Sequence, residues 1–170
     1  MIRVEYVLDS WKPVRQDTIA AVEDFPASEF DYRPAADVMT FGETARHILA
    51  AGTALSKFLL AGVEDFSSPV LREEMKAQWA AIPEHPTQEW LGKELRQSME
   101  QMIPQLAAQP PEFYAGIITR MDRAHITRLE MVQSIKEHEM VHRAQLFFCL
   151  RMKGIVPATT RRRMAQQASR

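Results

Sequence analysis

Residues 127–153 read TRLEMVQSIKEHEMVHRAQLFFCLRMK and carry the strongest structural signal in the chain. Thr127 and Glu130 have the spacing of a capping box, in which each side chain satisfies a free backbone amide at a helix start. From there, residues recur at alternating steps of four and three, which is the pattern of a helix facing into a bundle. The members of this seam are Met131, Ile135, His138, His142, Gln145, Cys149 and Met152. The stretch therefore predicts a long inward-facing helix that reaches about Lys153 and stops at Gly154.

Helical periodicity is also present in residues 4–23, 40–60 and 87–107. In the first of these, Pro13 either kinks the helix or sits in its first turn after a cap at Ser10. The second begins with another capping box, formed by Thr40 and Glu43. Four long helices predict an all-α fold, and a four-helix bundle is their natural packing.

The connections between these helices are irregular. Ser68 and Pro69 have the pattern of a cap and first turn, which predicts a short helix to about Ala81. Residues 113–123 are the only part with β character, and we expect a small hairpin there with Asp122 at its turn. The expected organisation is a helical bundle domain over residues 1–154 and a basic tail over residues 155–170.

The 170 residues suit one domain, and 46% apolar content is enough for a core. Residues 143–170 contain seven basic residues and no acidic residue. We expect this end to be solvated and partly frayed, because it lacks the aromatic interleaving and motifs typical of nucleic-acid binding. The longest uncharged stretch has 11 residues, too short for a membrane helix. No signal peptide is recognisable, and the single cysteine, Cys149, fits a cytoplasmic protein.

Three of the five histidines are placed to meet. His138 and His142 are four residues apart on one helix, so their side chains lie on the same face. His47 shares the expected inner face of its own helix with Thr44, Ala51, Ala54 and Phe58. Each imidazole could instead be a buried side chain bonded to a carbonyl, but a shared metal ion would satisfy all three together. Three neutral nitrogens with an open fourth position describe a catalytic or ligand-accepting site.

The remaining two histidines, His85 and His125, are expected to face solvent. Residues 138–142 also match the H-E-x-x-H pattern of zinc peptidases, in which the glutamate, here Glu139, is the general base. Such enzymes usually take their third ligand downstream, and residues 143–170 contain no His, Asp or Glu. The pattern therefore favours an upstream third ligand, His47, over a conventional peptidase.

Four neighbouring residues have weaker assignments. Gln145 falls on the histidine face and could orient a ligand or a metal-bound water. Glu139 is either a base or second-layer residue, or an exposed ion-pair partner. Arg143 contacts either an anionic substrate or the surface. Cys149 is about two turns from His142, so a buried core thiol is the better interpretation.

Together these stretches resemble the DinB/YfiT-like family of helical-bundle metalloenzymes. The matching pieces are Arg33-Pro34, Phe41 to His47, His138 to Leu146 and Leu150 to Pro157, in the family's order. The family often has Gly where this chain has Ala144, which is an easy substitution on a helix. The resemblance implies an up-down-down-up bundle, a divalent metal on His47, His138 and His142, and frequent homodimers.

Characterised relatives in this family include transferases and isomerases that use thiols such as bacillithiol and mycothiol. We therefore expect a metal-dependent thiol S-transferase or hydrolase that acts on a small molecule, with Zn²⁺ or Ni²⁺ as the ion and a low-molecular-weight thiol as co-substrate. The alternative is a metal-binding stress-response or interaction module without turnover. Nucleic acid and membrane are not expected partners.

Overall fold

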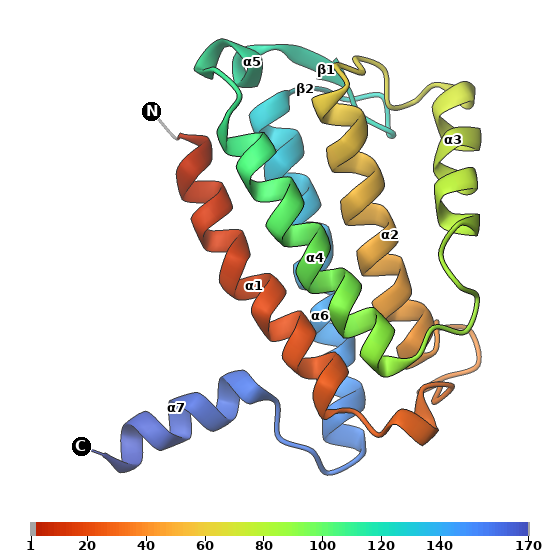
Figure 1. The fold of residues 1–170 in the computed structure, drawn as a ribbon, viewed down its shortest axis with the longest axis vertical. Coiled ribbons are helices and arrows are strands. Elements are labelled where there is room, and N and C mark those ends of the chain that lie inside the picture. Colours follow the sequence, from red (N-terminus) through yellow and green to blue (C-terminus); the bar gives the residue numbers. More distant parts are fainter. Residues whose placement is uncertain (1–2, 170) are drawn as a thin grey trace.

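The structure is a computed structural model and describes residues 3–169. Four long helices form a bundle: α1 (Val4–Asp24), α2 (Phe41–Leu60), α4 (Gln88–Ala107) and α6 (Arg128–Met152). Following the chain colours in Figure 1, α2 and α4 run in one direction, and α1 and α6 run in the other. The predicted all-α bundle with up-down-down-up topology is thus confirmed.

The helix starts follow the predicted caps. Thr40 and Thr127 each accept from the backbone amide of the glutamate three residues later, and each glutamate bonds back to the cap amide. At the other end of α6, Gly154 takes a φ of 73°, a left-handed conformation that glycine adopts without strain. Thr87 caps α4 by accepting from the amide of Trp90. Local chemistry therefore sets three of the four bundle helix starts.

Of the two forms expected for the first helix, the structure excludes the one that begins after a cap at Ser10. α1 is helical from Val4 through Pro13 without a break, so Ser10 does not cap it. The Ser10 hydroxyl instead donates to the carbonyl oxygen of Val7, inside the helix. Burial of Val4, Val7 and Leu8 holds the first two turns in place, which is why the helix extends upstream of the proline.

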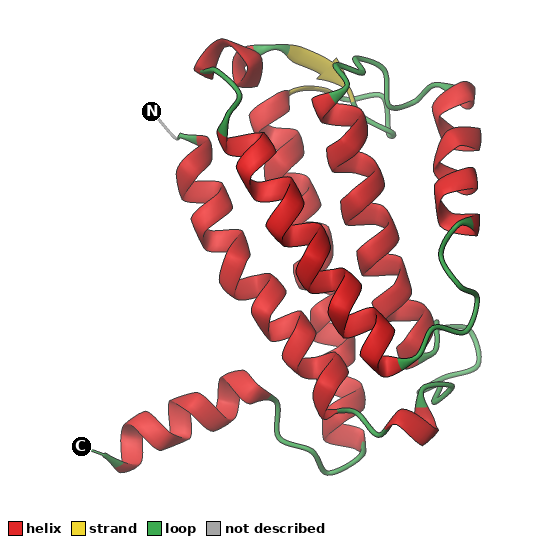
Figure 2. Cartoon of the chain, viewed as in Figure 1, coloured by secondary structure: helices red, strands yellow, loops and turns green. Residues whose placement is uncertain are grey.

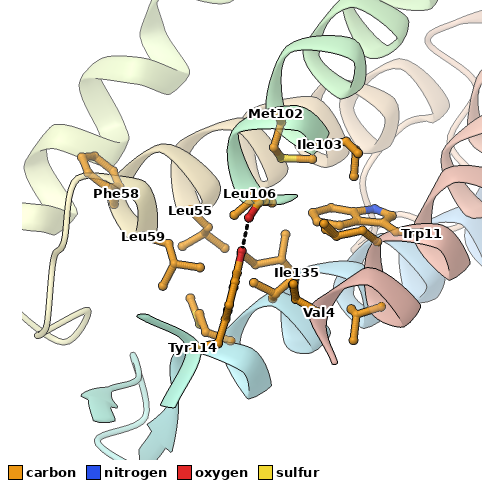
Figure 3. Close-up of a cluster of buried hydrophobic side chains, with 14 of the residues drawn as sticks. Val4, Trp11, Leu55, Phe58, Leu59, Met102, Ile103, Leu106, Tyr114 and Ile135 are labelled. Atoms are coloured by element: carbon orange, nitrogen blue, oxygen red, sulfur yellow. Dashed lines mark hydrogen bonds between the residues drawn. The ribbon is translucent and has the colours of Figure 1, made fainter. Parts of the chain in front are cut away.

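Two apolar clusters form the core, one toward each end of the bundle. The cluster near the hairpin includes Trp11, Leu55, Leu106 and Ile135, and there Tyr114 donates its hydroxyl to the carbonyl of Leu106 (Figure 3). The other cluster includes Ile19, Ile48, Leu95, Leu146 and a stacked pair, Phe25 and Phe41, with ring centroids 3.7 Å apart. On α1, α4 and α6, the polar residues Arg15, Ser98 and Glu139 fall between these two clusters.

The connections carry the smaller elements: a 3-10 turn (Ala27–Glu29), α3 (Pro69–Ala80), α5 (Pro111–Ala115), and strands β1 (Ile117–Thr119) and β2 (His125–Thr127). α3 confirms the predicted short helix and stands beside α2 (Figure 1). The hairpin exists but lies further along the chain than residues 113–123, because residues 113–115 are helical and β2 extends to Thr127 (Figure 2). Asp122 lies at the turn, as expected, and Arg123 has a φ of 68°.

The C-terminal segment is more ordered than expected. Residues predicted to fray form helix α7 (Ala158–Ala168) after a turn at the bundle base (Figure 1). Its basic residues have acidic partners on α1: Arg161 pairs with Asp24, and Arg162 pairs with Asp17. Among the described residues, no helix is long and apolar enough to cross a membrane.

Candidate metal centre

The three predicted ligands, His47, His138 and His142, converge on one point. Nε2 of His138 lies 2.9 Å from Nε2 of His47 and 3.2 Å from Nε2 of His142. The three ring centroids form a nearly equilateral triangle with sides of 4.5, 4.6 and 4.8 Å. Helix α6 supplies the His138 and His142 rings, and α2 supplies the His47 ring. The close contact between α2 and α6 therefore creates the cluster.

This arrangement fits a metal ion. Zinc binds histidine nitrogen at about 2.0–2.1 Å in tetrahedral geometry, which places neighbouring ligand nitrogens about 3.3 Å apart. The observed separations of 2.9 and 3.2 Å are close to that value. The three ligand nitrogens lie within 4.8 Å of one another, so a single ion can contact all of them. Three nitrogens leave a fourth tetrahedral position for another ligand.

The protonation of the rings also favours metal binding. Burial, together with the neighbouring charges of His138 and His142, lowers the pKa of His47 to about 4. The pKa of His138 is likewise lowered, first by burial and then by His142. Both rings are therefore neutral near pH 7, and neutral imidazole is the form that binds metals.

Gln145 orients one of the three rings. Its Oε1 lies 2.8 Å from Nδ1 of His142. Because an amide oxygen can only accept, Nδ1 of His142 carries the proton and donates it to Gln145. Nε2 of His142 then has a free lone pair directed at the other two histidines. Contacts of this kind fix the tautomer and direction of metal-binding histidines.

Glu139 lies in the core, on the α1 side of α6, and is only 2% exposed. Its carboxylate makes a two-pronged pair with Arg15, at 2.8 and 2.9 Å, and also accepts from Trp11 at 2.7 Å and Thr18 at 2.8 Å. Burial raises the pKa of Glu139, but the Arg15 charge and these donors outweigh it and hold that pKa below its usual range. The exposed ion-pair alternative is therefore wrong.

The inner face of α6 is rotated from its predicted position. Glu139 and Leu146 are buried, whereas Gln145 is exposed and Met152 is 57% exposed. His138 and His142 are half-buried at the edge of the core. The spacing of residues along α6 predicts the histidines on the buried face and Glu139 outside it. Spacing within one helix cannot predict the pairing with Arg15 of α1, which holds Glu139 in the core.

Arg143 has protein partners. Its Nη1 lies 3.5 Å from Asp17, and its guanidinium lies over the ring of Phe147 at 5.3 Å. This half-buried contact with the buried Asp17 links α6 to α1, and a contact of Arg143 with an anionic substrate stays a prediction. Cys149 is buried, as expected for a core thiol, and burial raises the pKa of its thiol. His85 and His125 are exposed, as expected.

Sequence reasoning missed two features of this region. The first is Arg15, whose remaining nitrogen, Nη1, donates to Ser98 at 2.8 Å and to the Leu95 carbonyl at 3.0 Å. The sequence feature that could have revealed Arg15 is its position on the apolar face of α1, four residues after Trp11. The second is the position of the predicted helix α3, which brings the Trp79 ring to 5.2 Å from the His47 ring. Arg46 holds this end of α3 by donating to the carbonyls of Trp79 and Ile82.

Comparison with known proteins identifies the family. The family model of the DinB superfamily matches residues 11–146, and the chain belongs to that superfamily. No curated protein sequence matches the chain significantly. The matched region contains all three histidines and both residues of the buried Arg15–Glu139 pair.

Solved structures with the same fold have low sequence identity. A DinB-like protein from Bacillus cereus has a TM-score of 0.69 at 15% identity, over 90% of this chain and 94% of that protein. A DinB-like protein from Bacillus subtilis has a TM-score of 0.65 at 19% identity, over 88% and 92%. A mycothiol-dependent maleylpyruvate isomerase has a TM-score of 0.64 at 13% identity, over 85% of this chain but only 61% of the isomerase.

Proposed function

We propose that this protein is a divalent-metal-dependent enzyme, specifically a thiol S-transferase or a hydrolase. The observation that carries the proposal is the convergence of the His47, His138 and His142 Nε2 atoms, with an orienting contact from Gln145. A closed structural site would have four protein ligands, whereas this cluster offers three. The mycothiol dependence of the structurally similar isomerase supports a thiol as the co-substrate.

The chain's own residues have defined tasks in this proposal. A bound Zn²⁺ or Ni²⁺ would lower the pKa of a thiol or water near the three histidines. His47, His138 and His142 hold the ion through neutral nitrogens, and Gln145 keeps His142 in the metal-binding tautomer. Trp79 packs against the His47 ring on the α3 side of the cluster.

The geometry disfavours peptidase chemistry by the H-E-x-x-H route. A general base needs a free carboxylate oxygen within hydrogen-bond reach of the attacking water. Both oxygens of Glu139 are instead occupied by Trp11, Arg15 and Thr18 on the α1 side. In this protein Glu139 fixes the position of α6, and we propose that the ion itself, not Glu139, activates the nucleophile.

We also propose a homodimer that forms through the outer face of α6. Val141, Phe148 and Met152 are exposed apolar side chains on this helix, and the first two are two turns apart on one side. Exposed apolar surface of this kind is typical of interaction sites. Sedimentation analysis of the full chain and of Phe148→Asp tests this: the wild type should sediment as a dimer and the variant as a monomer.

Turnover is tested by conjugation of 1-chloro-2,4-dinitrobenzene with a panel of thiols that includes mycothiol, bacillithiol, glutathione and cysteine. Each assay is run with metal-free protein and with protein loaded with Zn²⁺ or Ni²⁺. We expect one thiol to support metal-dependent conjugation that His142→Ala abolishes. If no thiol does so, S-transfer is wrong, and ester and amide hydrolysis by the same loaded protein becomes the next test.

A further inference from the structure

A cavity of about 530 Å³ opens beside His47, between α2, α3 and the hairpin turn. Its α2 side consists of His47 and three alanines, whose small side chains leave the space open. Phe66, Met75, Trp79 and Met121 contribute the remaining apolar surface, and Arg72 and Lys76 complete the lining.

The charged residues that line this cavity, apart from His47, have one sign. Arg72 and Lys76 carry positive charge, and no acidic residue lines the cavity within the described part of the chain. A mostly apolar cavity with a few polar groups is the usual form of a small-molecule site, in which the polar groups set orientation. Here the orienting groups are two cations, which favour an anionic group on the ligand.

The two cations lie on the same face of α3 as Trp79. Arg72, Lys76 and Trp79 are separated by steps of four and three, so their side chains point to one side of the helix. At 1.5 Å per residue, the cations lie roughly 5–10 Å along the helix from Trp79. Trp79 contacts the His47 ring at 5.2 Å. A ligand that spans this distance would therefore have its anionic end at the cations and its other end at the histidines.

Both cations can turn to a ligand without breaking a strong contact. Lys76 pairs with Glu73 at 2.7 Å, but both side chains are more than 70% exposed. Exposed ion pairs of this kind contribute little to stability. Arg72 donates from one nitrogen to the carbonyl of Ser67 at 3.2 Å, and a guanidinium has further donors.

From this arrangement we infer that the cavity binds an apolar, preferably aromatic, molecule that carries a carboxylate. The carboxylate pairs with Arg72 and Lys76, the apolar body lies between the alanines of α2 and Met75, and the opposite end reaches His47. Such a molecule would be the electrophilic substrate of the proposed enzyme, and its assignment as a substrate therefore rests on the proposed function. Binding of the carboxylate itself does not require the metal.

The test uses two probes of the same shape, 2-naphthoate and 2-naphthamide, with the full-length protein treated with chelator. Absence of metal removes direct coordination of the carboxylate as an explanation for binding. Calorimetric titration should show that the naphthoate binds about tenfold or more tightly than the amide, as charge-assisted hydrogen bonds allow. The double variant Arg72→Met with Lys76→Met should lose this preference, while still binding the amide.

Lys93→Met is the matched control, since Lys93 is exposed on α4 and does not line the cavity. It should keep the full preference for naphthoate, and circular dichroism should show that all variants are folded. Three results would overturn the inference: no binding of either probe, equal binding of both, or an unchanged preference in the double variant. If naphthoate binding holds but the loaded enzyme never turns over, the proposed function fails and the anion site stands.

Discussion

Replacement of Glu139 by glutamine separates a structural role from a catalytic one. The substitution keeps the shape of the side chain but removes its charge and one of its acceptor oxygens. Arg15, which is 2% exposed, would then be a buried cation without its carboxylate. Trp11 and Thr18 donate to the two different oxygens, so one of them would face an amide NH₂ group instead of an acceptor.

The magnitude follows from this geometry. Removal of one partner from a buried ion pair lowers the free energy of unfolding by about 3–5 kcal/mol. For a chain of this size, each kcal/mol changes the melting temperature by about 2–4 °C. We therefore expect Glu139→Gln to melt roughly 6–20 °C below the wild type, while the histidine cluster, on the other side of α6, retains its metal.

Thermal and urea unfolding, followed by circular dichroism, measure this change, and elemental analysis measures the bound metal. Glu137→Gln is the control, because Glu137 is exposed on the same helix. It should change stability by less than about 0.5 kcal/mol. The reasoning is refuted if Glu139→Gln is as stable as the wild type. Loss of metal or turnover at unchanged stability would show instead that Glu139 acts in the site, as a catalytic base would.

Three smaller changes are expected elsewhere. Gln145→Leu should weaken zinc affinity about 10–100-fold by releasing His142 Nδ1, measured by competition with a chelating dye; an unchanged affinity, or an equal loss in Gln133→Leu, would contradict the orienting role. Burial, then the charge of Glu5, raises the pKa of Tyr114 to about 12. A free phenol ionises near pH 10, so the neutral Tyr114 side chain stabilises the fold fully below about pH 10, and this stabilisation is lost as the pH rises through about 12. Absorbance titration at 295 nm should show a final ionisation step that Tyr114→Phe lacks. Thr40→Ala removes a capping box and should lower the free energy of unfolding by about 1 kcal/mol in urea titrations, and no change would show that the cap is dispensable.

The helix ends were the most predictable part of the fold. Capping boxes at Thr40 and Thr127 and the glycine at 154 act through bonds within a few residues, so their effect is visible in the sequence. The start of α1 was ambiguous, because burial of Val4 and Leu8 by distant helices, not a local cap, sets it. The order of α7 likewise depends on acidic partners about 140 residues earlier in the chain.

The convergence of the three histidines was predictable from the sequence, but the surroundings of the cluster were not. His138 and His142 are one turn apart on α6, and the helical face of His47 predicted that it would meet them, although the buried face of α6 itself is rotated from its predicted position. The role of Glu139 depends on Arg15, which is 124 residues away, and the sequence spacing contains no sign of that pairing. The cavity depends on how far α3 stands from α2, which no local pattern specifies.

Metal content of histidine variants tests the central claim most directly. The protein, His47→Ala and His125→Ala are each loaded with Zn²⁺, desalted and analysed for metal per chain. His138 and His142 alone would supply two nitrogens, fewer than the three protein ligands typical of catalytic zinc. We expect one equivalent in the wild type and in His125→Ala, and almost none in His47→Ala, with circular dichroism showing that all three are folded. A full equivalent in folded His47→Ala, or its loss in His125→Ala, would contradict the three-histidine site.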